Sequence, residues 1–425
     1  MIHIGKRMHD VIQRRDTCRG CDGHDLEMVF SLKPSPIGDA YVTSEKLNVN
    51  QPNYPIDLYM CKSCGLAQLI DVIDPDILYG EYLYVTSSST GLSRHFQEYT
   101  DSVINLCGLK PGSLVVDLGS NDGTLLRHFQ QRGMSVLGVE PAAHIAAKAT
   151  TSGIMTIDDF VSPDLAKKIV ANHGHAKLIT ANNVFANIDD LMSWVAAINE
   201  LLDDDGVFVF ESYYLADLVQ NMVFDFIYHE HLSSFSVRPM QALFERVGLE
   251  LVAVERVATK GGSLRYFVQR SNGPLKKDGS VVEMLALEES MGLYRKETFT
   301  AYTDKINGLK EQTKRFLAKA KSEGKSIVGF GASITGTTLI YHFEIGEYLD
   351  YLVDDNLAKQ GRFSPGLHLP VVSSSVLCER NPDYVIILAW RFSETIISKN
   401  QAYLEGGGQF LIPVPEFDIC QIKQH

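Results

Sequence analysis

The 425-residue sequence contains no apolar run of about 18 residues, the length that a transmembrane helix needs. Basic residues are also in the minority, because 39 Lys and Arg stand against 52 Asp and Glu, giving a formal net charge of -13. We therefore expect neither a membrane protein nor a protein whose main partner is a nucleic acid. Residues 1–15 have no apolar core, so no secretory signal is predicted and the cytoplasm is the expected location.

Cysteine is scarce, and its seven residues are too few for a disulfide framework at this length. Four of them form two C-x-x-C pairs, which together offer the tetrahedral thiolate shell that zinc favours. Because protein would fill every ligand position, the zinc is predicted to be structural; redox-active or unrelated cysteines are the alternative. Residues 30–55 are expected to form a loop between the pairs. The predicted ligands are Cys18, Cys21, Cys61 and Cys64.

Strand and helix patterns alternate twice along the chain, which is typical of parallel sheets covered by helices on both faces. The first unit follows a helix at 92–106, and a long polar helical region at 279–323 separates it from the second. The strand candidates are 114–118, 135–139, 177–180 and 206–211 in the first unit, and 326–330, 348–353 and 384–388 in the second.

The turn after the strand at 114–118 is rich in glycine, so its backbone can approach a ligand closely. A general dinucleotide fold would also explain such a turn. Two features favour S-adenosylmethionine (SAM): the turn lacks G-x-G-x-x-G spacing, and Glu140 ends the next strand, where a carboxylate can hold the ribose hydroxyls. Gly119 would pass beneath the methionine portion. The predicted SAM-binding residues are Asp117, Gly119, Ser120, Asn121, Asp122, Glu140, Pro141, Asp159, Phe160 and Asn182.

The densest group of catalytic residue types is Tyr228, His229, Glu230 and His231. Histidines two residues apart point to different faces of a helix, so a catalytic zinc site is not favoured here. A neutral imidazole can remove a proton from carbon next to a ketone, while a phenol steadies the developing enolate oxygen. A group of polar core or surface residues is the alternative.

The order of several motifs resembles the SAM-dependent deoxysugar C-methyltransferases of bacterial antibiotic and polysaccharide pathways, over residues 17–389. Besides the C-x-x-C pairs, the motifs are EYLYVTS, DLGSNDGTLL, GVEPA, ANNVFANIDD, IYHEHLSSFS, KGGSLR, GFGAS and VDDNLAKQGRFSPG. The resemblance implies methyl transfer to carbon, commonly C3, of a 4-keto-6-deoxysugar linked to dTDP or another nucleotide. It implies an α/β protein with a zinc-binding domain at 1–78, a Rossmann-like SAM-binding domain at 79–275 and a second Rossmann-like domain for the nucleotide-sugar at 276–425.

The resemblance also implies roles for particular residues. His231 would be the base, Glu230 and Tyr228 would support it, and Tyr82 would line the same site. Basic groups in KGGSLR would meet the phosphates of the substrate. The predicted substrate-binding residues are Lys260, Ser263 and Arg265.

Two positions depart from the family pattern. Asn187 stands where relatives often carry histidine, and Thr335 stands where many carry lysine. The first alters any acid-base or hydrogen-bonding role at that position, and the second changes the ligand contacts of the C-terminal domain. Separately, two alternative functions stay open: an O- or N-methyltransferase acting on a sugar or small metabolite, and a non-catalytic nucleotide-binding protein. We expect a monomer or a weak oligomer.

Overall fold

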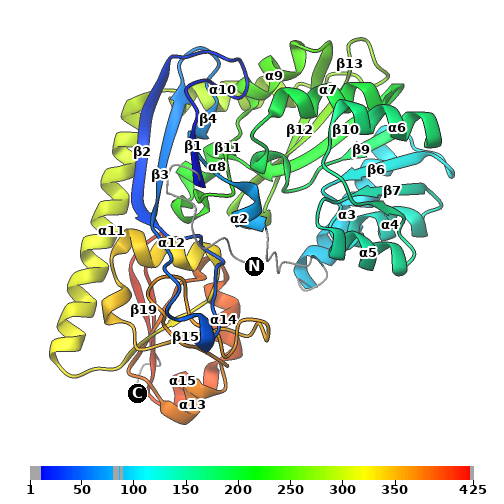
Figure 1. The fold of residues 1–425 in the computed structure, drawn as a ribbon. Helices are drawn as coiled ribbons and strands as arrows, with labels where there is room; N and C mark the ends of the chain where they lie inside the picture. The colour runs from blue at the N-terminus through cyan, green and yellow to red at the C-terminus, as the bar shows by residue number, and fades with distance from the viewer. Residues whose placement is uncertain (1–10, 80–85, 87–89, 422–425) are drawn as a thin grey trace.

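The computed structural model describes residues 11–79, 86 and 90–421, and three large sheets organise them (Figure 1). The central sheet and its helices form one lobe, drawn in green and cyan, and the C-terminal sheet forms a second lobe, drawn in orange and red. The N-terminal sheet lies beside the long helix α11 (Lys296–Ser322), which leads from the first lobe to the second.

The central sheet has seven strands in the order β12-β13-β10-β9-β6-β7-β8. The strands are parallel except for β13, which lies antiparallel to both β10 and β12. Their bounds are β6 (Leu114–Leu118), β7 (Ser135–Val139), β8 (Thr156–Ile157), β9 (Ala176–Thr180), β10 (Leu202–Tyr213), β12 (Leu249–Val257) and β13 (Ser263–Arg270).

Helices cover both faces of this sheet, as the alternating pattern predicted. Helices α3 (Thr90–Cys107) and α4 (Thr124–Gln131) pack on one face, and α6 (Pro163–His173), α7 (Leu191–Leu201) and α9 (Val237–Glu245) pack on the other. Helix α5 (Ala143–Thr151) follows β7, and α8 (Leu215–Gln220) follows β10. The predicted strands 114–118 and 135–139 are confirmed, because parallel strands buried on both faces appear as short continuous apolar runs.

The N-terminal sheet has four antiparallel strands in the order β11-β4-β3-β2. Their bounds are β2 (Leu26–Ser35), β3 (Tyr54–Cys61), β4 (Ala67–Leu69) and β11 (Ser233–Ser234), and β1 (Ile12–Arg14) pairs with β5 (Asp71–Ile73) beside them. Alternate residues of β3 are buried, as expected for a strand with one inward face. The expected loop at 30–55 is therefore wrong at both ends, where β2 and β3 continue into it.

The C-terminal sheet has six strands in the order β16-β15-β14-β17-β18-β19, parallel except for β19. Its strands are β14 (Ile327–Phe330), β15 (Leu352–Val353), β16 (Val371–Val372), β17 (Tyr384–Ile387), β18 (Gln409–Ile412) and β19 (Asp418–Cys420). Its helices are α12 (Ile334–Phe343), α13 (Val376–Arg380), α14 (Ser393–Lys399) and α15 (Gln401–Glu405). The strand expected at 348–353 is shorter, because a 3-10 turn at Gly346–Tyr348 precedes it.

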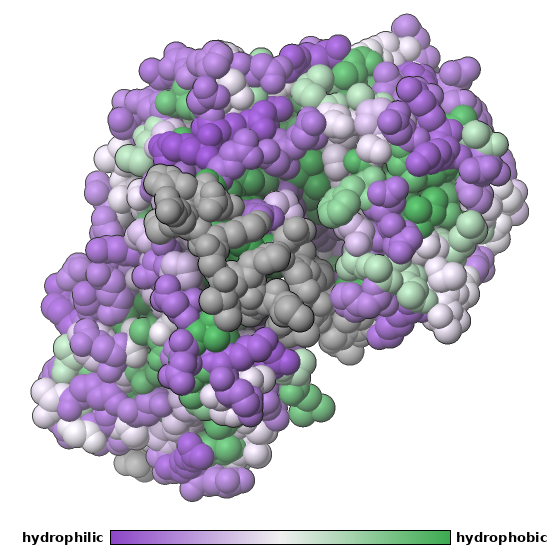
Figure 2. Space-filling view, in the orientation of Figure 1, coloured by the Kyte–Doolittle hydropathy of each residue, from purple (hydrophilic) through white to green (hydrophobic). Residues whose placement is uncertain are grey.

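The polar helical region at 279–323 is two helices, α10 (Ser280–Ser290) and α11. Over the part of the chain that the structure describes, no helix is both long and apolar enough to span a membrane. On the face shown in Figure 2, hydrophilic residues dominate and the hydrophobic ones form small separate groups.

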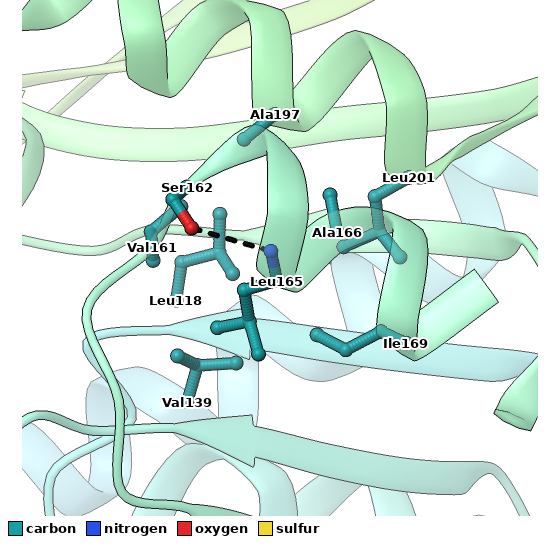
Figure 3. A pocket seen from close by; sticks show the side chains of 9 residues that line it. All are labelled: Leu118, Val139, Val161, Ser162, Leu165, Ala166, Ile169, Ala197 and Leu201. Atoms are coloured by element: carbon teal, nitrogen blue, oxygen red, sulfur yellow. Dashed lines mark hydrogen bonds between the residues drawn. The ribbon is translucent and has the colours of Figure 1, made fainter. Parts of the chain in front are cut away.

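A small cavity of about 10 Å³ lies between α6, α7 and the central sheet (Figure 3). Apolar side chains such as Leu118, Val139 and Leu165 line it, and the Ser162 hydroxyl beside it accepts a hydrogen bond from the Leu165 amide. The volume is about that of one water, so this cavity is a packing void and not a ligand site.

Candidate active site

The four predicted metal ligands come together between the N-terminal strands. The Sγ atoms of Cys18, Cys21, Cys61 and Cys64 all lie within 4.8 Å of one another. Cys18 and Cys64 are 3.5 Å apart and Cys21 and Cys61 are 3.6 Å apart, close to the ~3.8 Å edge of a tetrahedron with Zn–S bonds of about 2.3 Å. The donor set therefore fits zinc, with no protein position left open for a catalytic water.

The glycine-rich turn leaves the central sheet after β6. Gly119 has φ +75, and a Cβ there would lie 2.8 Å from Cγ2 of Val184. Asp117 lies beneath the turn, where its carboxylate accepts a hydrogen bond of 2.6 Å from the Thr180 hydroxyl and burial raises its pKa to about 7. The turn is thus packed tightly against the loop that follows β9.

Replacing Gly119 with alanine should raise the Kd for SAM about tenfold or more, because the added Cβ must push Val184 and displace the turn. Gly112→Ala is the matched control: Gly112 has φ +86, yet a Cβ there meets nothing within 4 Å. Both glycines have φ in the left-handed region, so titration calorimetry with SAM compares two strained positions that differ in whether the added Cβ meets a neighbour. Equal affinities for the two variants would remove Gly119 from the cofactor site.

Glu140 ends β7 with its carboxylate against the same turn. Its two oxygens accept hydrogen bonds of 3.0 Å from the amides of Asn121 and Ala142, and burial raises its pKa. Asn121 in turn accepts a hydrogen bond of 2.9 Å from the amide of Thr86, while Asp122 accepts bonds from Thr124. The carboxylate is fixed in place, and each of its oxygens can accept a second hydrogen bond.

Two predicted cofactor residues have buried polar atoms without a partner among the described residues, Oγ of Ser120 and Nδ2 of Asn182. The other end of the Asn182 amide accepts a hydrogen bond of 2.8 Å from the amide of Glu211 on β10. Unpaired buried donors are costly, so they fit a site that a polar ligand completes. Pro141, Asp159 and Phe160 are exposed, and their predicted part in cofactor binding stays a prediction.

The HEH loop, residues 227–232, lies between the 3-10 turn Phe224–Phe226 and β11. His231 is 7% exposed, its Nδ1 lies 2.7 Å from the carbonyl oxygen of Phe226, and its Nε2 lies 2.8 Å from the Tyr228 hydroxyl. Since a carbonyl only accepts, Nδ1 carries the proton and Nε2 carries the lone pair. Burial lowers the pKa of His231 to about 3, so the ring is neutral at physiological pH.

The ring of His231 stacks on Tyr213 with centroids 4.7 Å apart. Tyr213 is the last residue of β10, two residues after Glu211. The imidazole therefore lies at the same edge of the central sheet as Asn182 and the glycine turn, since these strand ends are neighbours in the parallel sheet.

The other two members of the HEH triplet have separate environments. His229 is buried with Nε2 3.3 Å from the carbonyl oxygen of Tyr54, and burial lowers its pKa to about 4. Burial raises the pKa of Glu230 to about 8, with Asp39 adding to the rise and Lys260 and Lys359 opposing it. His229 therefore joins the loop to the N-terminal sheet, whereas Glu230 lies in a charged region shared by several segments.

Of the three residues predicted to contact phosphate, Arg265 and Ser263 already have partners within the protein. Arg265 is 3% exposed and pairs with Glu211 at 2.6 Å and Glu255 at 2.8 Å, and Ser263 donates 3.0 Å to the Thr259 carbonyl oxygen. Lys260 has φ 56 in the turn Thr259–Gly261, and burial lowers its pKa to about 8 while Glu211 and Glu230 oppose that change. Lys260 is thus the member of this set best placed to meet an added anion.

Sequence reasoning missed a buried group around Glu211, the fully buried carboxylate on β10. His95 of α3 approaches Glu211 to 2.7 Å on the side opposite its pairing with Arg265. The three residues lie far apart in the sequence, and no local pattern marks them. The group fixes α3, β10 and β13 around the predicted SAM pocket.

A second missed contact joins the 3-10 turn Phe224–Phe226, directly before the HEH loop, to the C-terminal lobe. Asp225 is fully buried and accepts hydrogen bonds from Arg391 at 2.8 Å and from Nε1 of Trp390 at 3.0 Å. The Arg391 guanidinium lies 4.4 Å from the ring centroid of Phe226 and donates 3.4 Å to the hydroxyl of Thr335. The position that departs from the family's lysine is therefore beside this buried ion pair.

Tyr82 lies outside the described residues, so its expected place in the site stays a prediction. Asn187 ends the 3-10 turn Phe185–Asn187, and its Oδ1 is buried without a partner among the described residues.

Comparison with known proteins gives three matched segments. A zinc binding domain model matches residues 18–79, a methyltransferase domain model matches 92–254, and a C-methyltransferase C-terminal domain model matches 258–415. The C-methyltransferase NovU of Streptomyces niveus is 33% identical over 410 residues, which cover 96% of this chain and 98% of NovU. The chain belongs to this C-methyltransferase family.

Membership confirms that the C-methyltransferase uses SAM as its methyl donor and carries a zinc-binding N-terminal segment, as the sequence predicted. Solved structures give a weaker likeness. The magnesium protoporphyrin IX methyltransferase of Synechocystis PCC 6803 is 15% identical with TM-score 0.34, covering 43% of this C-methyltransferase and 84% of that chain. The PH0226 protein of Pyrococcus horikoshii is 13% identical with TM-score 0.37, covering 44% and 95%. These low values add nothing to the family assignment.

Proposed function

We propose that the enzyme methylates C3, the carbon next to the ketone of a nucleotide-linked 4-keto-6-deoxysugar, with His231 as the base. The observation that carries this proposal is the fixed tautomer of His231, which leaves the lone pair on Nε2 beside the Tyr228 hydroxyl. Methylation of carbon requires removal of a C–H proton. Burial keeps His231 neutral and able to accept that proton, and because it also makes the ring a weak base, hydrogen bonding to the enolate oxygen must assist the transfer.

In the proposed reaction, Nε2 of His231 accepts the proton from the carbon beside the ketone, and the C–H electrons pass into the enolate of the sugar. The Phe226 carbonyl stays hydrogen-bonded to Nδ1–H and steadies the imidazolium that forms. The Tyr228 hydroxyl, released from Nε2 as the sugar binds, donates to the enolate oxygen. SAM, when bound, would supply an electrophilic methyl group to that carbon: the enolate electrons form the new C–C bond, the methyl–sulfur bond breaks, and S-adenosylhomocysteine leaves.

The substrate's phosphates are proposed to meet Lys260, because this ammonium lies near Glu230 of the HEH loop and forms no salt bridge with any of the described residues. Arg265 and Ser263 would then support the site without contacting the substrate, since Arg265 is paired with Glu211 and Ser263 is hydrogen-bonded to the Thr259 carbonyl oxygen. Gly119, Ser120, Glu140 and Asn182 are proposed to hold SAM, with Asp159 and Phe160 covering its adenine.

The direct test incubates the enzyme with SAM and a small panel of nucleotide-linked 4-keto-6-deoxysugars and analyses the products by mass spectrometry and NMR. The expected product gains one methyl group on the carbon next to the ketone. In D2O without SAM, that carbon should exchange its proton for deuterium. A product methylated on oxygen or nitrogen, with no exchange, would contradict the proposal.

A further inference from the structure

An arginine inside the metal knuckle, the C-x-x-C turn of residues 18–21, contacts the end of the HEH loop. Arg19 stands between Cys18 and Cys21, and it is 1% exposed, although arginine is almost never fully buried without partners. Its position in sequence makes it part of the segment that the metal folds. Its side chain contacts three segments outside the C-x-x-C turn, at Leu69, Asp189 and Leu232.

The guanidinium of Arg19 meets two backbone carbonyls there. Its Nη1 donates 2.5 Å to the carbonyl oxygen of Leu69 and 3.3 Å to that of Leu232, the residue directly after His231. The Leu232 carbonyl also accepts 2.9 Å from the amide of Leu69 at the end of β4. One carbonyl oxygen thus joins the metal knuckle, the N-terminal sheet and the HEH loop.

Arg19 also reaches the segment that contains Asn187. Its Nε donates 2.9 Å to the carboxylate of Asp189, two residues after Asn187 and directly before the N-cap residue of α7. Arg15 binds the same carboxylate at 3.2 Å, and its other hydrogen bonds go to the carbonyl oxygens of Thr17 and Asp189. The contact with Leu232 therefore distinguishes Arg19 from its neighbour.

We infer that Arg19 is a positioning residue: it transmits the geometry of the metal knuckle to the backbone at Leu232 and so aims the His231 ring at the substrate carbon. The inference rests on the proposed function of His231. Hydrogen bonds from a charged donor are strong, and a buried site strengthens them further. A shift of about 1 Å in a catalytic group can cost a hundredfold in rate, so a small change at Leu232 is enough.

The test compares Arg19→Met and Arg19→Lys with the matched control Arg15→Met. For each variant we would measure zinc per chain, the Kd for SAM, kcat and KM, and the rate of deuterium exchange into the sugar without SAM. Arg19→Met should keep its zinc and its SAM affinity, with KM within about threefold. Its kcat and exchange rate should both fall about 10- to 100-fold. Arg19→Lys should recover part of that loss, and Arg15→Met should match the wild type.

Three results would overturn the inference: an Arg19→Met enzyme that exchanges deuterium at the wild-type rate, one that loses its zinc, or an equal loss in Arg15→Met. If Arg19→Met does not fold, Arg19→Lys decides the question by the same criteria. His231→Asn measured alongside separates the two proposals. Loss of exchange in His231→Asn with none in Arg19→Met ends only the positioning role. Exchange retained in His231→Asn but lost in Arg19→Met ends only the base assignment.

Discussion

An enzyme carrying His231→Asn should bind SAM normally and transfer methyl groups about a thousandfold more slowly. The asparagine amide can still donate a hydrogen bond to the Phe226 carbonyl, which lies 2.7 Å from Nδ1 of the wild-type ring. It offers no basic nitrogen in place of Nε2, so the local fold is kept while the proton acceptor is lost. Single-turnover assays and calorimetry with SAM measure the two properties separately.

Two neighbouring variants serve as controls for this prediction. Tyr228→Phe keeps the imidazole and removes the hydroxyl 2.8 Å from Nε2, so its kcat should fall less, about 10- to 100-fold. His229→Gln lies in the same loop, but its side chain points to the carbonyl of Tyr54, so it should lower thermal stability more than kcat. Wild-type turnover in His231→Asn would end the base assignment.

Cys61→Ser should lose bound zinc and unfold the N-terminal strands. Structural zinc contributes about 10–16 kcal/mol of apparent binding free energy in small zinc domains, far more than the core of β3 and β4 alone can replace. Because β4 pairs with β11, the loss should extend to the HEH loop and remove activity. Metal analysis, together with hydrogen exchange of segments 54–69 and 226–235, measures both effects.

Cys378→Ser is the matched control, because Cys378 is exposed and lies outside the metal cluster. It should keep full zinc content, exchange protection and turnover. A Cys61→Ser enzyme that retained wild-type protection at 226–235 would show that the HEH loop does not depend on the metal-bound strands.

The parts of the fold that could be predicted are those with local signals. The strands 114–118 and 135–139 and the helix after the glycine turn follow from short apolar runs, a turn and helix periodicity. The antiparallel strands β12 and β13 were not predicted, although Leu249–Val257 and Ser263–Arg270 are separated by a short glycine turn. The second strand of the C-terminal sheet was expected too long, because the buried residues Leu349 and Tyr351 before it continue the apolar pattern without joining the ladder.

The candidate site also contains residues with a local sequence signal and residues without one. Four cysteines, the glycine turn and the HEH triplet could be found because their chemistry is concentrated in a few adjacent residues. The ion pairs of Glu211 with Arg265 and of Asp225 with Arg391 could not, since each joins segments more than fifty positions apart. The ion pairs of Arg265 with two carboxylates are likewise visible only in the three-dimensional structure.

The HEH loop is held on both sides: Trp390 and Arg391 bind Asp225 in the turn before it, and Arg19 binds the carbonyl of its last residue, Leu232. Chimeras of related enzymes could be built to change which sugar is accepted. A breakpoint between the lobes would separate the two partners of these contacts into different parents. A transplanted C-terminal lobe lacking an equivalent of Arg391 would leave a buried carboxylate unpaired in the host. Recombination should therefore succeed most often when Asp225, Arg391 and Arg19 are inherited from the same parent.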